Sequence, residues 1–169
     1  MALLKDGKKA FLRHHGNPSI HLKIVAEFTI EDGIDSYDVS LVDGFNLPLS
    51  IGPQELSREC QWTSCPGNIN AVCPPELAVK GQDGSVIACK SACKAFGSPQ
   101  YFCAGAYRSS NFLPTNYSKI FKGQCPQAYS YAHDDHRSTL NCRDSLNYLI
   151  KFSKNFLMYK MSEVALLRN

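Results

Sequence analysis

The stretch that decides the fold covers residues 37–49 and is YDVSLVDGFNLPL. Apolar residues at positions 37, 39 and 41 alternate with Asp38 and Ser40, which predicts a β-strand with one buried face and one polar face. Asp43-Gly44 ends the strand, because an aspartate can bond its own backbone in a turn and a glycine accepts a positive φ. The sequence therefore places two carboxylates, those of Asp38 and Asp43, near the same strand end.

A second strand precedes this one and forms a hairpin with it. Apolar and polar residues alternate between residues 25 and 30, with Glu27 on the polar face, and residues 31–34 form the predicted turn. A four-residue loop puts Glu27 directly opposite Asp38. Two carboxylates in this position repel, so the pair is a candidate site compensated by a cation, sugar hydroxyls or water. Two solvated acids on an open sheet face are the alternative.

Length and composition indicate one globular domain, since 169 residues with 44% hydrophobic content can bury a core. No apolar run has the length of a membrane span, and residues 1–4 are followed at once by Lys5-Asp6, so neither a span nor a signal peptide is expected. The net charge is +3, but residues 1–24 carry +4 and residues 146–169 carry +3, which leaves −4 between them. An acidic body with basic ends does not fit nucleic-acid binding.

Eight cysteines between Cys60 and Cys142 indicate disulfides formed in an oxidising compartment. A zinc ribbon is the alternative, but the close cysteine pairs do not have matching spacings and no histidine lies nearby. The run HDDH at residues 133–136 suggests a metal site, yet four consecutive residues cannot converge on one ion, so a solvated turn is favoured. The histidines at positions 14, 15 and 21 are assigned to a flexible basic arm, and neither a metal nor a cofactor is expected.

Further regular elements are expected along the chain. Ser85 as a cap and Gly97 as an end predict a helix over residues 85–97. A second helix is predicted over residues 117–122. Residues 1–24 show no clear period, and the last segment shows only a loose helical stripe, which we interpret as a frayed tail. Strands are predicted at residues 47–51, 128–131, 138–142 and 148–152.

The quoted stretch also resembles the thaumatin-like proteins, the plant pathogenesis-related group 5 family. The resemblance covers about residues 25–152, through AEFTI (26–30), CPPEL (73–77), ACKSAC (88–93), YSKIFK (117–122), CPQAYSYA (125–132) and STLNC (138–142). It implies a mainly β fold, a partial thaumatin-type β-sandwich with a disulfide-rich loop and helix region, in an N-terminally truncated member of the family. The implied organisation has three parts: a basic N-terminal arm at 1–24, a thaumatin-like domain at 25–152 and a C-terminal tail at 153–169. Within the domain, the sandwich strands lie at 25–59 and 126–152, and the disulfide-rich subdomain lies at 60–125.

The resemblance also implies a disulfide pattern, which spacing alone cannot choose. Carried over position by position, the family pattern pairs Cys60 with Cys142, Cys65 with Cys125, and Cys73 with Cys89. The usual partners of Cys93 and Cys103 are replaced by phenylalanines at positions 102 and 112. We therefore predict a Cys93–Cys103 bridge, which requires their Cα atoms to lie within about 7 Å.

A further implication is an acidic cleft between the sandwich and the disulfide-rich region, lined here by Glu27, Asp38, Asp43 and Asp134. The arginine that accompanies these acids in the family belongs to strands that this chain lacks. Such a cleft implies a secreted, antifungal plant defence protein that binds β-1,3-glucan or another part of the fungal surface. If the chain also cleaves glucan slowly, Glu27 is the candidate acid and Asp43 the candidate nucleophile or base. Binding is favoured over catalysis, because catalysis needs a geometry that the missing strands would support.

Other outcomes stay open. An inactive truncated family member would keep the fold without a ligand, and a protease or amylase inhibitor rests on analogy alone. Exposed strand edges predict possible self-association. The expected location is extracellular by resemblance. Asn116-Tyr117-Ser118 is a formal N-glycosylation sequon, which has meaning only in an exported chain.

Overall fold

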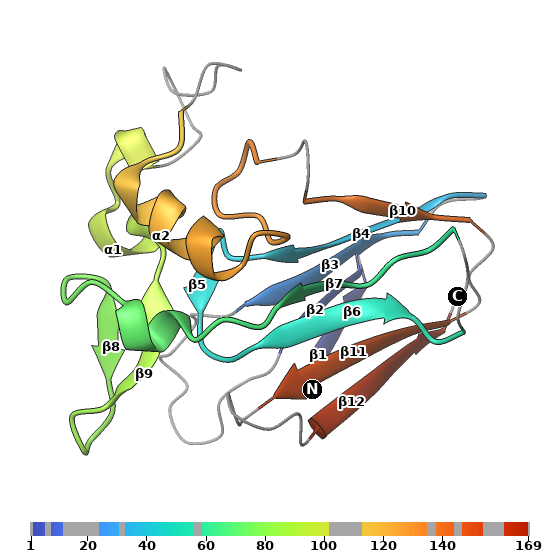
Figure 1. Ribbon diagram of the computed structural model, residues 1–169, viewed down its shortest axis with the longest axis horizontal. Coiled ribbons are helices and arrows are strands. Elements are labelled where there is room, and N and C mark those ends of the chain that lie inside the picture. The colour runs from blue at the N-terminus through green and yellow to red at the C-terminus, as the bar shows by residue number, and fades with distance from the viewer. Residues whose placement is uncertain are drawn as a thin grey trace.

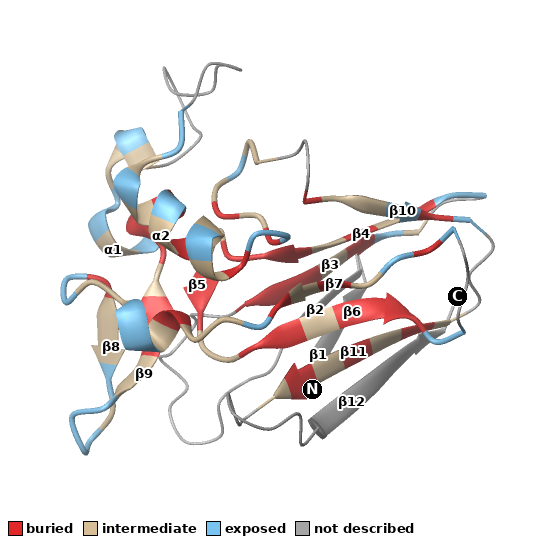
Figure 2. Cartoon of the chain, in the orientation of Figure 1, coloured by how far each residue is buried: buried red, intermediate tan, exposed pale blue. Residues whose placement is uncertain are grey.

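The computed structural model describes residues 2–5, 8–11, 24–30, 33–55, 59–101, 113–134, 138–143, 147–153 and 161–168. Two larger sheets lie on one side of the molecule, and a small sheet lies with the helices on the other (Figure 1). Among the residues whose burial is described, the buried ones concentrate in the inner strands of the two larger sheets and where the helices meet these sheets (Figure 2). The fold is mainly β, as predicted, with the helices confined to the cysteine-rich region.

The first sheet carries the predicted hairpin. Its strands lie in the order β1-β2-β3-β4-β10 with antiparallel neighbours, and their bounds are Ala2–Lys5, Lys8–Phe11, Val25–Thr29, Asp35–Ser40 and Leu140–Cys142. The pairing of β3 with β4 sets Glu27 opposite Asp38, which confirms the register predicted from a four-residue turn. Ala26 and Phe28, on the other face of β3, are buried in the core.

The second sheet covers the buried face of the first. Its strands lie in the order β12-β11-β6-β7, with bounds Met161–Arg168, Asn147–Ser153, Leu49–Pro53 and Thr63–Cys65. Alternate side chains of β11 are buried, and the Tyr148 ring lies 5.3 Å from that of Phe28 and 5.1 Å from that of Tyr37, centroid to centroid. Because Phe28 and Tyr37 come from β3 and β4, the core sits between the two sheets, as in a sandwich.

The cysteine-rich region is built from short elements. The small sheet has the order β5-β9-β8, with bounds Gly44–Phe45, Val86–Lys90 and Ala78–Lys80. The helical segments are η1 (Ile69–Val72), α1 (Ala92–Phe96), η2 (Pro99–Tyr101) and α2 (Asn116–Gln124). Within the described part of the chain, no helix has the length and apolar character needed to cross a bilayer.

The helix predicted over residues 85–97 is wrong in its first half. Val86–Lys90 is the central strand of the small sheet, because it pairs with β5 and β8 and its β-branched residues suit a sheet. The helix begins only after Ser91, whose hydroxyl accepts a hydrogen bond from the Lys94 N–H at 3.2 Å. Gly97 ends it with φ +60°, as predicted. The second predicted helix is present as α2 and is longer than expected.

The two ends of the chain contribute strands that the sequence pattern did not predict. β1 and β2 extend the first sheet beyond β3, so the expectation of a structureless segment 1–24 is wrong for these residues. β12 pairs with β11 along its length, which corrects the interpretation of the last segment as a frayed tail. In both cases pairing with a distant strand outweighs a weak local pattern.

The strand predicted at residues 128–131 is reduced to one bridge between Ser40 and Tyr129. The boundaries proposed at residues 24 and 153 stay predictions, as does self-association through strand edges.

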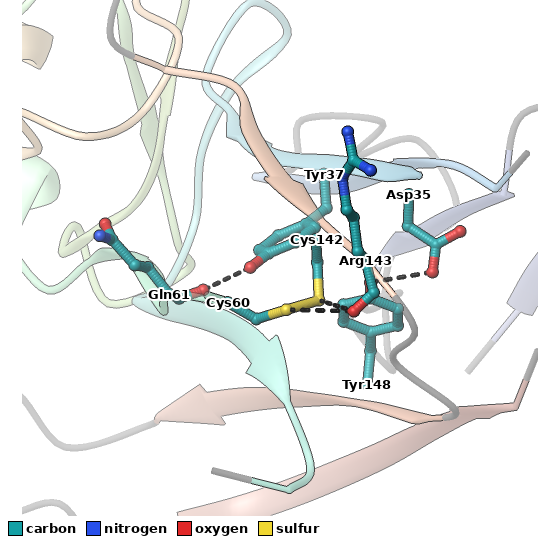
Figure 3. Close-up of a disulfide and its surroundings, with 7 residues drawn as sticks. All are labelled: Asp35, Tyr37, Cys60, Gln61, Cys142, Arg143 and Tyr148. Atoms are coloured by element: carbon teal, nitrogen blue, oxygen red, sulfur yellow. Dashed lines mark hydrogen bonds between the residues drawn. A yellow bond between two sulfur atoms is a disulfide. The ribbon is translucent and has the colours of Figure 1, made fainter. Parts of the chain in front are cut away.

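Among the described residues, three disulfides cross-link the cysteine-rich region, and two of them involve strands of the larger sheets. Cys60 bonds to Cys142, Cys65 to Cys125 and Cys73 to Cys89, with Cα–Cα distances of 4.9, 4.6 and 5.8 Å. These are the three pairs that the family resemblance implies. Figure 3 shows the Cys60–Cys142 bridge between β10 and the segment before β7, with the backbone oxygen of Arg143 at 3.7 Å from each sulfur. Cys103 lies outside the described residues, so the Cys93–Cys103 bridge stays a prediction.

The outer face of the second sheet holds Trp62 flat against Gly52. A Cβ atom on Gly52 would lie 2.4 Å from the indole ring, and Lys151 Nζ lies 4.3 Å from the ring centroid. Gly52→Ala is therefore expected to displace the ring and to lower the free energy of unfolding by about 1–3 kcal/mol. The single tryptophan of the chain makes its fluorescence maximum a direct measure of the displacement.

Gly123→Ala is the matched control for this change. Gly123 lies in α2, and nothing approaches within 4 Å of the position of its Cβ. Alanine favours a helix over glycine, so this variant should keep the emission maximum and lose no stability. An unchanged emission maximum in Gly52→Ala would show that Trp62 does not pack on Gly52.

Candidate functional site

The centre of the candidate site is the pair Glu27 and Asp38 on the polar face of the β3–β4 hairpin. Both residues are partly buried, and they occupy directly opposite positions of the two strands. Side chains in such positions have Cβ atoms about 5 Å apart. Carboxylates at this distance can both accept hydrogen bonds from one ligand that approaches this face of the hairpin.

A basic residue shares this row of cross-strand positions. β2 pairs with the free side of β3 in a register that sets Lys9 opposite Glu27. The order across the sheet is therefore Lys9, Glu27, Asp38. The sequence placed Lys9 in the basic N-terminal arm, because the local pattern of residues 1–24 did not reveal the strand that carries it. Only the pairing of β2 with β3 reveals this neighbour.

Asp43 lies in the turn that follows β4. The Gly44 N–H donates to the Leu41 carbonyl at 2.9 Å, and Gly44 has φ +120° and packs so closely on β9 that a Cβ would lie 2.5 Å from the Cys89 oxygen. Only glycine fits this position. The Asp43 carboxylate forms an ion pair with Lys94 of α1 at 3.2 Å, and both side chains are about half exposed, at 48%. The turn thus holds an accessible carboxylate beside a helix of the cysteine-rich region.

Asp134 anchors the loop that runs beside β4. Its carboxylate accepts hydrogen bonds from the Ser130 N–H and hydroxyl, at 2.9 and 2.8 Å, and pairs with Lys122 of α2 at 2.9 Å. Lys122 also donates to the Ala128 carbonyl and the Ser138 hydroxyl, each at 3.0 Å. The Asp134 side chain is only 16% exposed. Its contacts indicate a structural anchor that leaves little carboxylate surface for a ligand.

The four predicted acids therefore differ in their surroundings. Glu27 and Asp38 face each other across one hairpin, in the same row as Lys9. Asp43 forms an ion pair with Lys94 of α1, and Asp134 forms one with Lys122 of α2. Sequence reasoning missed both lysines. The sequence spacing does not identify these lysines, because only the folded structure brings each lysine next to its acid.

A separate small pocket opens between the end of β4, the helices and residues 130–131. Its volume is about 30 Å³, and its lining, among the described residues, includes none of the four acids. Rings of Phe96, Tyr101 and Tyr117 cluster beside it, with centroids 5.1 to 5.9 Å apart. A volume of this size has room for ordered water.

One aromatic ring of this cluster is fixed by a carboxylate. The Tyr117 hydroxyl donates to Glu76 Oε1 at 2.8 Å. This bond raises the pKa of Tyr117, because a carboxylate acceptor stabilises the protonated phenol. The pKa of Glu76 is lowered by its own backbone N–H and then by the Tyr117 hydroxyl, since both donate to the charged carboxylate. The pair stabilises the ring cluster and makes no contact with the candidate site in the described residues.

The described residues contain no group of three histidine, cysteine, aspartate or glutamate side chains placed to hold a metal ion. Of the HDDH run, His133 and Asp134 are described, and residues 135 and 136 lie outside the described part. Asp134 is oriented by Ser130 and Lys122, as set out above. The chemistry that the site offers is therefore that of carboxylates, which accept hydrogen bonds and can transfer protons.

Comparison with known proteins identifies the family. The model of the thaumatin family matches residues 13–154, which is most of the chain. The chain belongs to the thaumatin family. This confirms the resemblance seen in the sequence, and the match begins upstream of residue 25, where the recognisable motifs start.

Several plant proteins are similar to this thaumatin-family chain. Thaumatin-like protein 1 of Castanea sativa is 53% identical over 141 residues, which are 82% of this chain and 58% of the relative. A Prunus avium protein named glucan endo-1,3-beta-glucosidase is 54% identical over 141 residues, with the same coverage. Thaumatin-like protein 1 of Pyrus pyrifolia is 60% identical over 121 residues, 71% of this chain and 50% of the relative. The chain spans only between half and three fifths of the length of these relatives.

Proposed function

We propose that this thaumatin-family chain is a secreted plant defence protein that binds fungal β-1,3-glucan through the acids Glu27, Asp38, Asp43 and Asp134. The observation that carries the proposal is the register that sets Glu27 against Asp38 on a sheet face. The name of the Prunus avium relative supports the class of ligand. Three disulfides support an extracellular location, since such bonds persist in oxidising compartments.

The four acids would have unequal roles in this binding. Glu27 and Asp38 bring two carboxylates together on one sheet face, and sugar hydroxyls can donate hydrogen bonds to both. Asp43 is half exposed beside Lys94, so this pair offers an acceptor and a donor at the edge of the site. Asp134 holds the neighbouring loop in place and would act on the ligand indirectly. The pair on the hairpin therefore contributes most of the affinity.

Retention on insoluble β-1,3-glucan tests the proposal. Each hydrogen bond between a hydroxyl and a carboxylate is worth about 1.5–3 kcal/mol, so Glu27→Gln and Asp38→Asn should each weaken retention roughly tenfold or more. The Glu27→Gln, Asp43→Asn double variant should be weaker still. The measurement is the bound fraction as a function of glucan concentration, with insoluble cellulose as the polysaccharide control.

Glu55→Gln is the matched control protein. Glu55 is exposed, it follows β6 outside the hairpin, and its replacement removes the same unit of charge. This variant should bind like the native chain. Failure of the native chain to bind would remove glucan as the ligand, and equal binding by all variants would remove the acids from the site.

A second candidate function is slow hydrolysis of the same glucan, which the name of the Prunus avium relative favours. Glu27 would protonate the leaving oxygen, and Asp43 would act as nucleophile or base. The ion pair with Lys94 holds Asp43 in place but also competes with a substrate for its carboxylate. Release of reducing sugar that Asp43→Asn abolishes, while glucan retention persists, would establish hydrolysis in addition to binding.

A further inference from the structure

Asn116 begins a tripeptide that the glucan proposal does not use. Asn116-Tyr117-Ser118 is the only place in the sequence where an asparagine is followed, two residues later, by serine or threonine without an intervening proline. At residues 17–19 the same spacing occurs, but Pro18 occupies the middle position. The tripeptide is the acceptor pattern for N-linked glycans.

The fold leaves the acceptor side chain accessible. Asn116 is the first residue of α2 and is exposed. The residue before it, Thr115, caps the helix: its hydroxyl accepts from the Ser118 N–H at 3.2 Å. The Ser118 hydroxyl donates to the Thr115 carbonyl at 2.9 Å. Because Thr115 and Ser118 complete the cap, the Asn116 carboxamide is not needed for it.

The disulfides indicate the compartment in which such a modification occurs. Three bridges connect segments up to 82 residues apart, and bridges of this kind form in the secretory pathway and not in the cytosol. The enzymes that attach N-linked glycans work in the same pathway. An accessible acceptor asparagine and an oxidised framework are independent observations that agree.

We propose that Asn116 carries an N-linked glycan. The donor is a lipid-linked oligosaccharide diphosphate: the Asn116 amide nitrogen bonds to C1 of the first N-acetylglucosamine and loses one proton, and the bond from C1 to the diphosphate oxygen breaks to release the lipid diphosphate. No oxidation or reduction takes place. The inference requires export of the chain, but it is independent of glucan binding.

The structure also indicates when transfer occurs. In the folded protein Ser118 is only 7% exposed and its hydroxyl is bonded within the cap, so the acceptor tripeptide is not available as a unit. Transfer therefore precedes formation of α2. After folding, the glycan would project from the exposed end of α2, close in sequence to Leu113, whose side chain is 79% exposed. A bulky polar glycan there would shield an apolar surface residue.

Translation of the full chain, behind a cleavable signal sequence, in the presence of microsomes tests this inference. The protease-protected product should show one shift in mobility that an N-glycosidase removes, and peptide mass spectrometry should find Asn116 converted to aspartate by the digestion. Asn116→Gln should lose the shift completely. Asn141→Gln, which replaces another exposed asparagine outside any such tripeptide, should keep it.

Two further measurements keep the result interpretable. Ser118→Thr preserves the acceptor pattern and should stay modified, whereas Ser118→Ala should not. The folded, unmodified chain incubated with detergent-solubilised transferase and the lipid-linked donor should remain unmodified. A protease-protected native chain without a glycan would overturn the inference, and modification of the already folded chain would overturn the order of events.

Discussion

Replacing Cys60 and Cys142 together with alanine is expected to lower the free energy of unfolding by about 4–5 kcal/mol. The two cysteines are 82 residues apart, so their bridge removes more freedom from the unfolded chain than a short loop would. It also fixes β10 to the segment that leads into β7, across the two sheets of the sandwich. The measurement is urea unfolding of the native and variant proteins under non-reducing conditions.

The Cys73→Ala, Cys89→Ala double variant shows whether the loss of stability depends on the length of the closed loop or is the same for the removal of any bridge. That bridge spans 16 residues, for which the same relation gives about 3 kcal/mol. Both double variants remove paired cysteines, so neither leaves an odd thiol from the broken bridge. If removing the short bridge lowers the free energy of unfolding as much as removing the long bridge, or more, then the bridges do not act mainly by restricting the unfolded chain.

Tyr148→Phe is expected to lower the free energy of unfolding by about 2–3 kcal/mol. The Tyr148 hydroxyl donates to Asp35 Oδ2 at 2.9 Å, and Asp35 is only 4% exposed, so the carboxyl group loses a donor that water cannot easily replace (Figure 3). The bond connects β11 of the second sheet to β4 of the first. The midpoint of thermal or urea unfolding measures the change.

Tyr37→Phe provides the matched control. Its hydroxyl also crosses the core, but it donates to the neutral backbone oxygen of Gln61, an exposed residue that solvent can reach. Its loss should cost about 1 kcal/mol. In a double-mutant cycle, Asp35→Asn should reduce the effect of Tyr148→Phe. Equal losses for the two tyrosine variants would show that the buried carboxyl group has no special role.

The parts of the structure that follow from local rules could be predicted from the sequence. The four-residue spacing between the two predicted strands was enough to predict the register of β3 and β4, which brings Glu27 opposite Asp38. The cap at Thr115 and the left-handed Gly97 similarly mark a helix start and a helix end. Each of these features depends on residues within a few positions of one another.

The parts that depend on distant partners could not be predicted. Val86–Lys90 has residues that suit either a short strand or a helix, and only β5 and β8 decide between them. β12 carries a weak helical stripe and forms a strand because β11 lies beside it. For the same reason the lysines that pair with Asp43 and Asp134 were not found. The disulfide pairs came from the family resemblance, since spacing alone leaves many combinations.

The three bridges are concentric: the loop closed by Cys73 and Cys89 lies inside that of Cys65 and Cys125, which lies inside that of Cys60 and Cys142. A ribosome delivers the chain from its N-terminus, so the partners become available from the innermost ring outwards. The two inner disulfides can therefore form before β11 has been added to the second sheet. Until β11 emerges at residues 147–153, β6 and β7 cover the apolar side of the β3–β4 hairpin only in part, so the nascent chain exposes part of its core and can bind chaperones during this interval.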